Sequence, residues 1–248
     1  MDTSALRQAT REHYEQFPFI EGGPRRVELW RDRLKRDLPD ELIKGRLILD
    51  VGCGVGEVAR SLRLRGAETV CVDLTYSAVS RNRALHPEAR PCQADALSLP
   101  FAAKTFDHSM SIGVLHHTPD CRRGLAELAR VTRPGGRIVV LLYASGTPYH
   151  LSYRLTAALR RKIPARSLDQ LPGWSIPWLR GAVRGFTGQR LDQQQLQRMI
   201  ADQFWTPQAS FHSVRQVRSW ASALGLDILT VRRIPLYSHV FVFRRLNL

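Results

Sequence analysis

Three aspartates follow short apolar runs in the first hundred residues, at positions where a side chain can meet a ligand. Asp50 closes the run LILD, Asp73 closes the run TVCVD, and Asp95 lies in the segment QADALSLPF. A carboxylate at the end of a buried strand can accept hydrogen bonds from hydroxyl and amino groups, although an acid in a solvated turn shows the same pattern. The three acids are therefore candidates for ligand contact.

A glycine-rich loop separates the first apolar run from a predicted helix. Gly52, Gly54 and Gly56 allow the backbone to turn sharply and to approach a ligand closely. The dinucleotide fingerprint G-x-G-x-x-G would need its third glycine at position 57, which is Glu57. A carboxylate there would repel a pyrophosphate at the helix N-terminus. The spacing predicts a ligand that lacks phosphate and presents a ribose to Asp73.

The pattern Asp50-x-Gly52-x-Gly54-x-Gly56 followed by Asp73 resembles the first two motifs of the class I S-adenosylmethionine-dependent methyltransferases. The resemblance continues through residues 47–143 and implies S-adenosylmethionine as cofactor and S-adenosylhomocysteine as product. It further implies that Asp95 caps the adenine amino group, and that GVLHHT, residues 113–118, borders the methyl-transfer pocket. The cofactor-binding residues that it implies are Asp50, Gly52, Gly54, Gly56, Asp73, Leu74, Asp95, Ala96 and Gly113.

The same resemblance implies an α/β, Rossmann-like fold. The sheet is expected to have seven mostly parallel strands with an antiparallel last strand, helices on both faces and a helical insertion after the fifth strand. We expect an N-terminal helical cap or lid at residues 1–46, the cofactor-binding core at 47–143, a substrate-facing insertion at 144–212, and the final helix and antiparallel hairpin at 213–248.

Capping residues and glycine stops indicate where individual elements begin and end. Asp120 is placed to cap a helix that reaches about residue 131, and Ser213 to cap a helix that Gly225 ends. Within the insertion we expect a helix at 149–163 and a second helix at 192–204. Strands are predicted at 106–112, 137–143, 227–234 and 237–244.

Segments on either side of the core resemble a bacterial subgroup of small-molecule methyltransferases. They are YEQFPF at 14–19, a basic helical insert at 142–162, and DQFWTP at 202–207 with His212 shortly after it. This similarity indicates architecture and leaves the methyl acceptor open.

Three histidines are candidates for proton transfer. His116 and His117 lie in the segment that resembles the edge of the methyl-transfer pocket, and His212 precedes the last helix. Methyl transfer from a sulfonium needs a general base only when the acceptor arrives protonated, and histidine titrates near neutral pH. A packed histidine at a strand end is the alternative for each.

Aromatic residues in the cap and the insertion are candidates for substrate contact. Two aromatics before Pro18 could form a lid over the cofactor, and an insertion also needs aromatics for a core of its own. The candidates are Tyr14, Phe17, Tyr143, Tyr149, Tyr153 and Trp205.

The net charge of +15 is concentrated near the C-terminus. Residues 144–248 carry 15 Lys and Arg against four Asp and Glu, a surplus of 11. A basic face attracts an anionic substrate, an acidic carrier protein, nucleic acid or an anionic membrane. We favour a small anionic or aromatic metabolite. The alternative is an RNA or other macromolecule methyltransferase in which Trp174, Trp178 and neighbouring arginines bind RNA.

Composition predicts a cytoplasmic enzyme without a structural metal. No apolar stretch approaches the roughly 20 residues that cross a bilayer, and the N-terminus lacks the apolar core of a signal peptide. The four cysteines include no C-x-x-C pair, and no His and Asp cluster has metal-ligand spacing.

Overall fold

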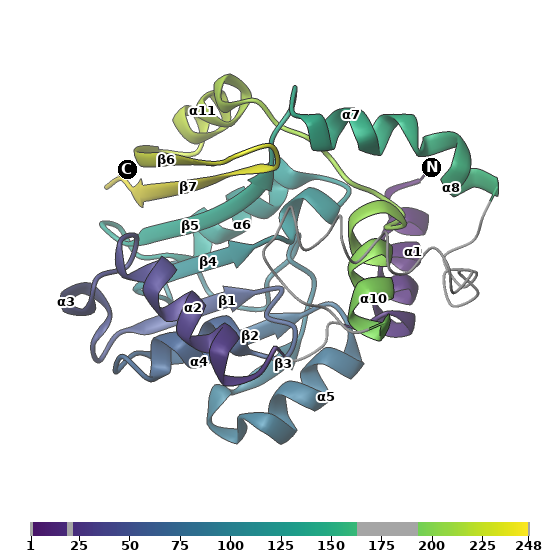
Figure 1. Ribbon diagram of the computed structural model, residues 1–248. Coiled ribbons are helices and arrows are strands. Elements are labelled where there is room, and N and C mark those ends of the chain that lie inside the picture. The colour runs from purple at the N-terminus through teal and green to yellow at the C-terminus, as the bar shows by residue number, and fades with distance from the viewer. Residues whose placement is uncertain (1, 19–21, 163–192, 248) are drawn as a thin grey trace.

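A seven-stranded sheet runs through the part of the chain that the computed structural model describes, residues 2–18, 22–162 and 193–247 (Figure 1). Its order is β3-β2-β1-β4-β5-β7-β6. The first five of these pair in parallel, whereas β7 is antiparallel to both of its neighbours, which confirms the expected fold class. The strands are β1 (Leu47–Val51), β2 (Glu68–Asp73), β3 (Pro91–Gln93), β4 (His108–Ile112), β5 (Arg137–Tyr143), β6 (Leu226–Ile234) and β7 (Ser238–Arg245).

Helices cover both faces of the sheet (Figure 1). Two of the predicted caps are present: the Asp120 carboxylate accepts a hydrogen bond from the Arg123 amide at 2.9 Å, and the Ser213 hydroxyl accepts one from the Gln216 amide at 3.1 Å. The α-helices are α1 (Thr3–Gln16), α2 (Gly23–Lys35), α3 (Asp40–Ile43), α4 (Glu57–Arg63), α5 (Tyr76–Leu85), α6 (Cys121–Val131), α7 (Pro148–Leu155), α8 (Ala157–Lys162), α10 (Gln193–Phe204) and α11 (Val214–Ala223), and the short 3-10 helices are η1 (Pro87–Ala89) and η2 (Leu115–His117).

Strand β5 shows why the sheet needs helices on both sides. Successive side chains of a strand point to opposite faces. Ile138, Val140 and Leu142 pack with α6 and α11, whereas Val139 and Leu141 pack with α2 and α4. The central strand is therefore buried on both faces, and its carboxyl end is held rigidly where the site lies.

The helix expected at residues 149–163 is two shorter helices. Helix α7 ends at Leu155, α8 begins at Ala157, and the Thr156 hydroxyl donates to the Ser152 carbonyl at 2.9 Å. A threonine side chain that bonds back to the preceding turn competes with the helical ladder and bends the chain. The insertion changes direction at this point, which the apolar spacing did not reveal.

Helix α1 and helix α10, although far apart in the sequence, lie side by side beyond the carboxyl ends of the parallel strands (Figure 1). Phe17, which follows α1, packs against Leu196 and Ile200 of α10. The N-terminal cap and the insertion are thus joined by a small core of their own above the sheet.

Candidate functional site

The glycine loop after β1 has a backbone that only glycine adopts without strain. Gly52 has φ +75° and Gly56 has φ +84°, both in the left-handed region. A Cβ on Gly52 would lie 2.6 Å from Cγ1 of Val114 and 2.8 Å from its Cβ. The loop after β1 therefore touches the loop after β4. Gly113, at φ +81°, begins that second loop.

Asp73, at the end of β2, fastens the glycine loop. Its carboxylate accepts hydrogen bonds from the Gly54 amide at 3.0 Å, the Thr75 amide at 3.0 Å and the Thr75 hydroxyl at 2.8 Å. Burial raises the pKa of Asp73, and these bonds oppose the rise. The hydrogen bonds thus offset part of the cost of burying the charged carboxylate beside the loop.

Asp50 lies deeper, at the end of β1. It is 2% exposed, and its Oδ2 has no hydrogen-bond partner among the described residues. Burial, followed by the nearby charge of Asp73, raises the pKa of Asp50 to about 7. An unsatisfied buried carboxylate oxygen next to a glycine loop fits a ligand that brings its own donor.

A cavity of about 320 Å³ lies between α1 and the ends of β2 and β3. Leu74 and Asp95, two of the predicted cofactor residues, line the cavity opposite α1. Ala96, also predicted, does not line it and packs against the hydrophobic core. The lining residues are Ser4, Arg7, Gln8, Arg11, Leu74, Gln93, Ala94 and Asp95. The cavity contains Asp95, the carboxylate that the family resemblance assigns to the adenine amino group, and this assignment stays a prediction.

Helix α1 is fastened to both sides of this cavity. Arg7 donates to Oδ2 of Asp95 at 2.6 Å, while the Leu97 amide donates to the other oxygen at 2.9 Å. Glu15 accepts hydrogen bonds from the first backbone amides of α5, those of Tyr76 at 2.7 Å and Ser77 at 3.2 Å. A carboxylate at a helix N-terminus is stabilised by the helix dipole. The prediction of an N-terminal lid is consistent with these contacts.

His117 is the histidine whose geometry suits a base. Its ring is 4% exposed, and Nδ1 lies 2.8 Å from the Gln208 carbonyl oxygen. Because a carbonyl only accepts, the proton of neutral His117 resides on Nδ1, and Nε2 keeps its lone pair. Nε2 forms no hydrogen bond with the described residues. Burial lowers the pKa of His117, so the ring is neutral near physiological pH.

The other two candidate histidines are held differently. His116 is fully buried and stacks on Tyr143 with 3.6 Å between ring centres, and burial lowers its pKa strongly. His212 lies 2.9 Å from the Ser210 hydroxyl through Nε2 and 3.3 Å from the Gln216 side-chain oxygen through Nδ1. Both of its nitrogens are engaged within the protein, so neither is free for a substrate.

Asp202 and Gln203 on α10 were not predicted as site residues, although they lie in the segment DQFWTP that the sequence singled out. The two oxygens of Asp202 accept hydrogen bonds from the Tyr14 hydroxyl at 3.1 Å and the Gln203 amide nitrogen at 2.8 Å. The amide oxygen of Gln203 accepts from Tyr237 at 2.8 Å and Tyr143 at 3.3 Å. These bonds link α1, α10, β5 and the β6–β7 turn.

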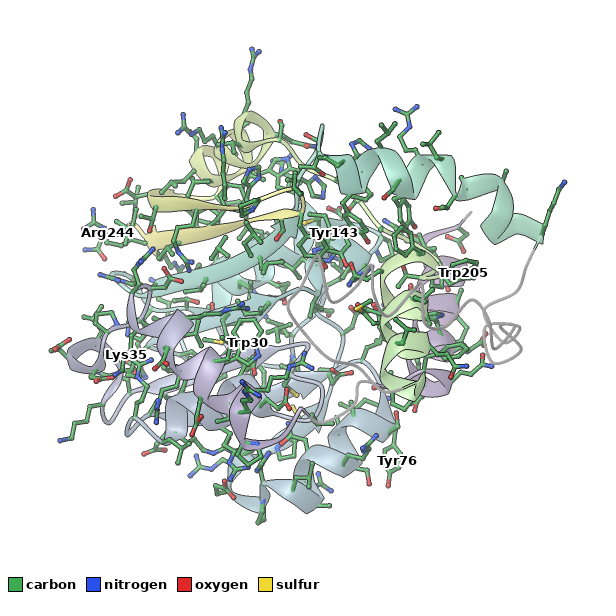
Figure 2. The ribbon with its side chains drawn as sticks, viewed as in Figure 1. Trp30, Lys35, Tyr76, Tyr143, Trp205 and Arg244 are labelled. Carbon is green, nitrogen blue, oxygen red and sulfur yellow. The ribbon has the colours of Figure 1, made fainter. Side chains whose placement is uncertain are left out.

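Aromatic side chains gather around Tyr143, the last residue of β5, which is labelled in Figure 2. Tyr149 lies with its ring centre 5.0 Å from that of Tyr143, and its hydroxyl donates to the Gln203 carbonyl at 2.6 Å. Tyr153 reaches the group through Phe211 at 5.3 Å. The predicted aromatics of β5 and α7 therefore form one continuous cluster at the carboxyl edge of the sheet.

Two predicted substrate residues lie elsewhere. Phe17 and Trp205 both pack against the small core between α1 and α10 (Figure 2 labels Trp205). In this structure they join the cap to the insertion.

Part of the basic insertion lies outside the described residues. This holds for Trp174, Trp178 and the arginines that the RNA alternative invoked. Within α7, Leu151 and Leu155 are 59% and 73% exposed.

The described part of the chain contains no group of three or more His, Cys, Asp or Glu side chains placed to hold a metal ion. In the same residues, no helix is both long and apolar enough to span a membrane.

Comparison with known proteins identifies the family of this chain. Residues 49–140 match the protein family described as Methyltransferase domain. The chain is 32% identical over 180 residues to a demethylmenaquinone methyltransferase of Corynebacterium urealyticum, covering 71% of this chain and 74% of that protein. It is 32% identical over 165 residues to methyltransferase GfsG of Streptomyces halstedii, covering 63% and 57% of the two chains.

Among solved structures, the chain resembles magnesium protoporphyrin IX methyltransferase from Synechocystis, which was crystallised with S-adenosylhomocysteine. The TM-score is 0.59 at 15% identity, covering 98% of this chain and 100% of the other. At this identity the likeness shows the fold.

Proposed function

This chain belongs to the class I S-adenosylmethionine-dependent methyltransferases, and on that basis we propose that it methylates a small aromatic molecule through an ionisable hydroxyl group. Such an acceptor becomes anionic when it loses its proton, so it combines the aromatic and anionic character expected from the sequence. The observation that carries the proposal is Nε2 of neutral His117, which forms no hydrogen bond with a described residue and lies beside a cluster of aromatic rings.

The residues present fit the cofactor. Asp73 would accept from the ribose hydroxyls, Asp95 and Leu74 would bind the adenine, and the unsatisfied oxygen of Asp50 would meet a donor at the amino-acid end. When bound, S-adenosylmethionine supplies a methyl group on a sulfonium and leaves as a neutral thioether. The chain's own task is to orient the acceptor, exclude water and remove a proton.

His117 suits the last of these tasks. A neutral imidazole with Nδ1–H held by the Gln208 carbonyl can take a proton at Nε2 without rotating. Deprotonating an aromatic hydroxyl raises the electron density on the oxygen and on the ring carbons conjugated with it. The same base therefore serves methylation at oxygen or at carbon.

The relatives support an acceptor of this class. The Corynebacterium urealyticum protein is named a demethylmenaquinone methyltransferase, and an O-methyltransferase of Penicillium expansum, cnsE, is 34% identical over 131 residues. The quinone that the first name denotes becomes an aromatic diol on reduction, which has the ionisable hydroxyl that His117 requires.

The proposal is tested with a panel of acceptors and cofactor labelled in the methyl group. The panel contains phenols, catechols and hydroquinones, and it includes aliphatic carboxylates and bulk tRNA as alternative methyl acceptors. Products are identified by mass spectrometry. We expect label in the hydroxylated aromatics and a loss of about 100- to 10,000-fold in His117→Gln, the range for a general base. His239→Gln, on β7, is the matched control. Label confined to carboxylates or tRNA, or full activity in His117→Gln, would contradict the proposal.

A further inference from the structure

The side chains around His117 come from four different parts of the chain. Tyr14 of α1 lies with its ring centre 6.1 Å from that of His117, His116 is 4.4 Å away and Tyr143 of β5 is 5.3 Å away. Asp202 of α10 reaches this group through its hydrogen bond with the Tyr14 hydroxyl. A base in such surroundings is cut off from bulk water, so its neighbours determine how readily it holds a proton.

The groups facing His117 differ in charge. His13 on α1 is neutral, because burial and the proximity of His117 lower its pKa to about 4. His116 is neutral through burial, and burial likewise raises the pKa of Tyr143 and keeps its hydroxyl protonated. The Asp202 carboxylate remains as the charge that acts on His117.

We propose that Asp202 is a positioning residue that enables His117 to act as a base. The inference rests on the function proposed above and deepens it: the acceptor must be one that gives up a proton. The carboxylate offsets the positive charge that the imidazole gains, and α1 and α10 fix it in place.

The proton transfer balances as follows. The hydroxyl of the acceptor gives its proton to Nε2 of His117 and keeps the electron pair of the broken O–H bond on oxygen. In O-methylation that pair would form the bond to the methyl carbon, while the carbon–sulfur bond of the bound cofactor would break with its electron pair remaining on sulfur. His117 becomes an imidazolium with protons on both nitrogens, and it returns the proton to solvent after the product leaves. A buried imidazolium is costly unless a negative charge lies nearby.

Hydrogen bonds to both oxygens of Asp202 oppose the effect of burial on its carboxylate. Burial raises its pKa, whereas the charge of His117 and the bonds from Tyr14 and Gln203 lower it. The orientation of the Gln203 amide follows from chemistry: the Asp202 carboxylate only accepts, so the amide nitrogen faces it and the amide oxygen accepts from Tyr237. Both carboxylate oxygens thus have donors that favour the charged form.

The test is an NMR titration of histidine ring signals, which requires no methyl acceptor. The proteins carry ¹³C-labelled histidine and a saturating amount of S-adenosylhomocysteine, and His117→Gln identifies the His117 signal. We expect Asp202→Asn to lower the pKa of His117 by about one unit or more, the effect of removing a nearby opposite charge. Asp227→Asn, which removes an exposed carboxylate paired with Arg244, is the control and leaves the titration unchanged.

Two further variants distinguish charge from packing. Tyr14→Phe removes one of the two donors to Asp202 but keeps the carboxylate and its bond from Gln203, so the pKa of His117 should fall by less than in Asp202→Asn. Asp202→Glu retains the charge and is expected to restore the titration towards that of wild type. Equal shifts in Asp202→Asn and Tyr14→Phe would show a packing effect and overturn the inference, as would an unchanged His117 titration in Asp202→Asn.

The two proposals fail in different ways. The pKa of His117 could shift as expected while the acceptor panel yields no methylated aromatic product. That result would support the effect of Asp202 on His117 and reject the proposed acceptor. If Asp202→Asn lowers the melting temperature sharply, its affinity for S-adenosylhomocysteine shows whether the folded fraction is native. The His117 titration of Asp202→Glu is then compared with that of wild type in its place.

Discussion

Gly52→Ala adds one methyl group to the glycine loop and should destabilise the protein. The structure separates the expected loss of stability into two contributions, steric overlap and backbone strain. The new Cβ would lie 2.6 Å from Cγ1 and 2.8 Å from Cβ of Val114, well inside van der Waals contact, and closer still to Cγ2. Valine is branched at Cβ and stiff at χ1, so it cannot swing aside. The backbone at Gly52 has φ +75°, which alanine adopts only with strain.

Two costs therefore add. The left-handed backbone costs alanine about 1–2 kcal/mol, and overpacking against an ordered neighbour costs about 1–3 kcal/mol. We expect Gly52→Ala to lower the free energy of unfolding by about 2–5 kcal/mol. Val114→Ala in the same chain removes both Cγ atoms and should recover the part of the overpacking cost that they cause, while the contact with Cβ of residue 114 and the backbone strain remain.

The measurement is urea unfolding followed by tryptophan fluorescence, arranged as a double-mutant cycle for Gly52 and Val114. Gly135→Ala is the matched control, since its φ is +79° and an added Cβ meets no described atom within 4 Å. It should cost the backbone strain alone. Additive effects of Gly52→Ala and Val114→Ala, or a Gly52→Ala cost equal to that of Gly135→Ala, would refute the close approach of the two loops.

Three further outcomes are expected. Asp73→Ala should weaken S-adenosylmethionine binding by about 1–3 kcal/mol in calorimetry, because charge-assisted hydrogen bonds are lost; unchanged affinity would contradict its role. Deleting residues 1–20 should leave a folded core that binds cofactor poorly and loses turnover, and wild-type turnover would make α1 an appendage. Neutralising Arg160, Arg161 and Lys162 together should leave tRNA binding weak at physiological salt; submicromolar affinity with a log-log salt slope of several units, lost in the triple variant, would favour an RNA substrate.

The core could be predicted from the sequence because its signals are local. The glycine spacing, the strand-end acids and the caps Asp120 and Ser213 each depend on a few neighbouring residues, and the structure has strands and helix starts at these positions. The bend at Thr156 was missed because its cause is a side-chain bond within one turn, which leucine spacing does not show.

The candidate site was predicted less completely because its parts meet only in the fold. Asp202 lies in a segment that the sequence singled out, yet its partner Tyr14 is 188 residues away. Arg7 and Asp95 are separated by 88 residues. Contacts at such separations depend on how α1 and α10 pack above the sheet, which periodicity does not encode.

Helix α1 connects the two ends of the site through one rigid element. Arg7 donates to Asp95, the carboxylate proposed to bind adenine; Tyr14 donates to Asp202, the carboxylate proposed to act on His117; and Glu15 accepts from the first amides of α5. A ligand group that replaces Arg7 at Asp95 breaks one of these three contacts of α1. The stability of the other two contacts is then expected to change. We therefore expect cofactor binding and acceptor binding to be thermodynamically coupled. If bound cofactor changes the affinity for the acceptor by some factor, bound acceptor changes the affinity for the cofactor by the same factor.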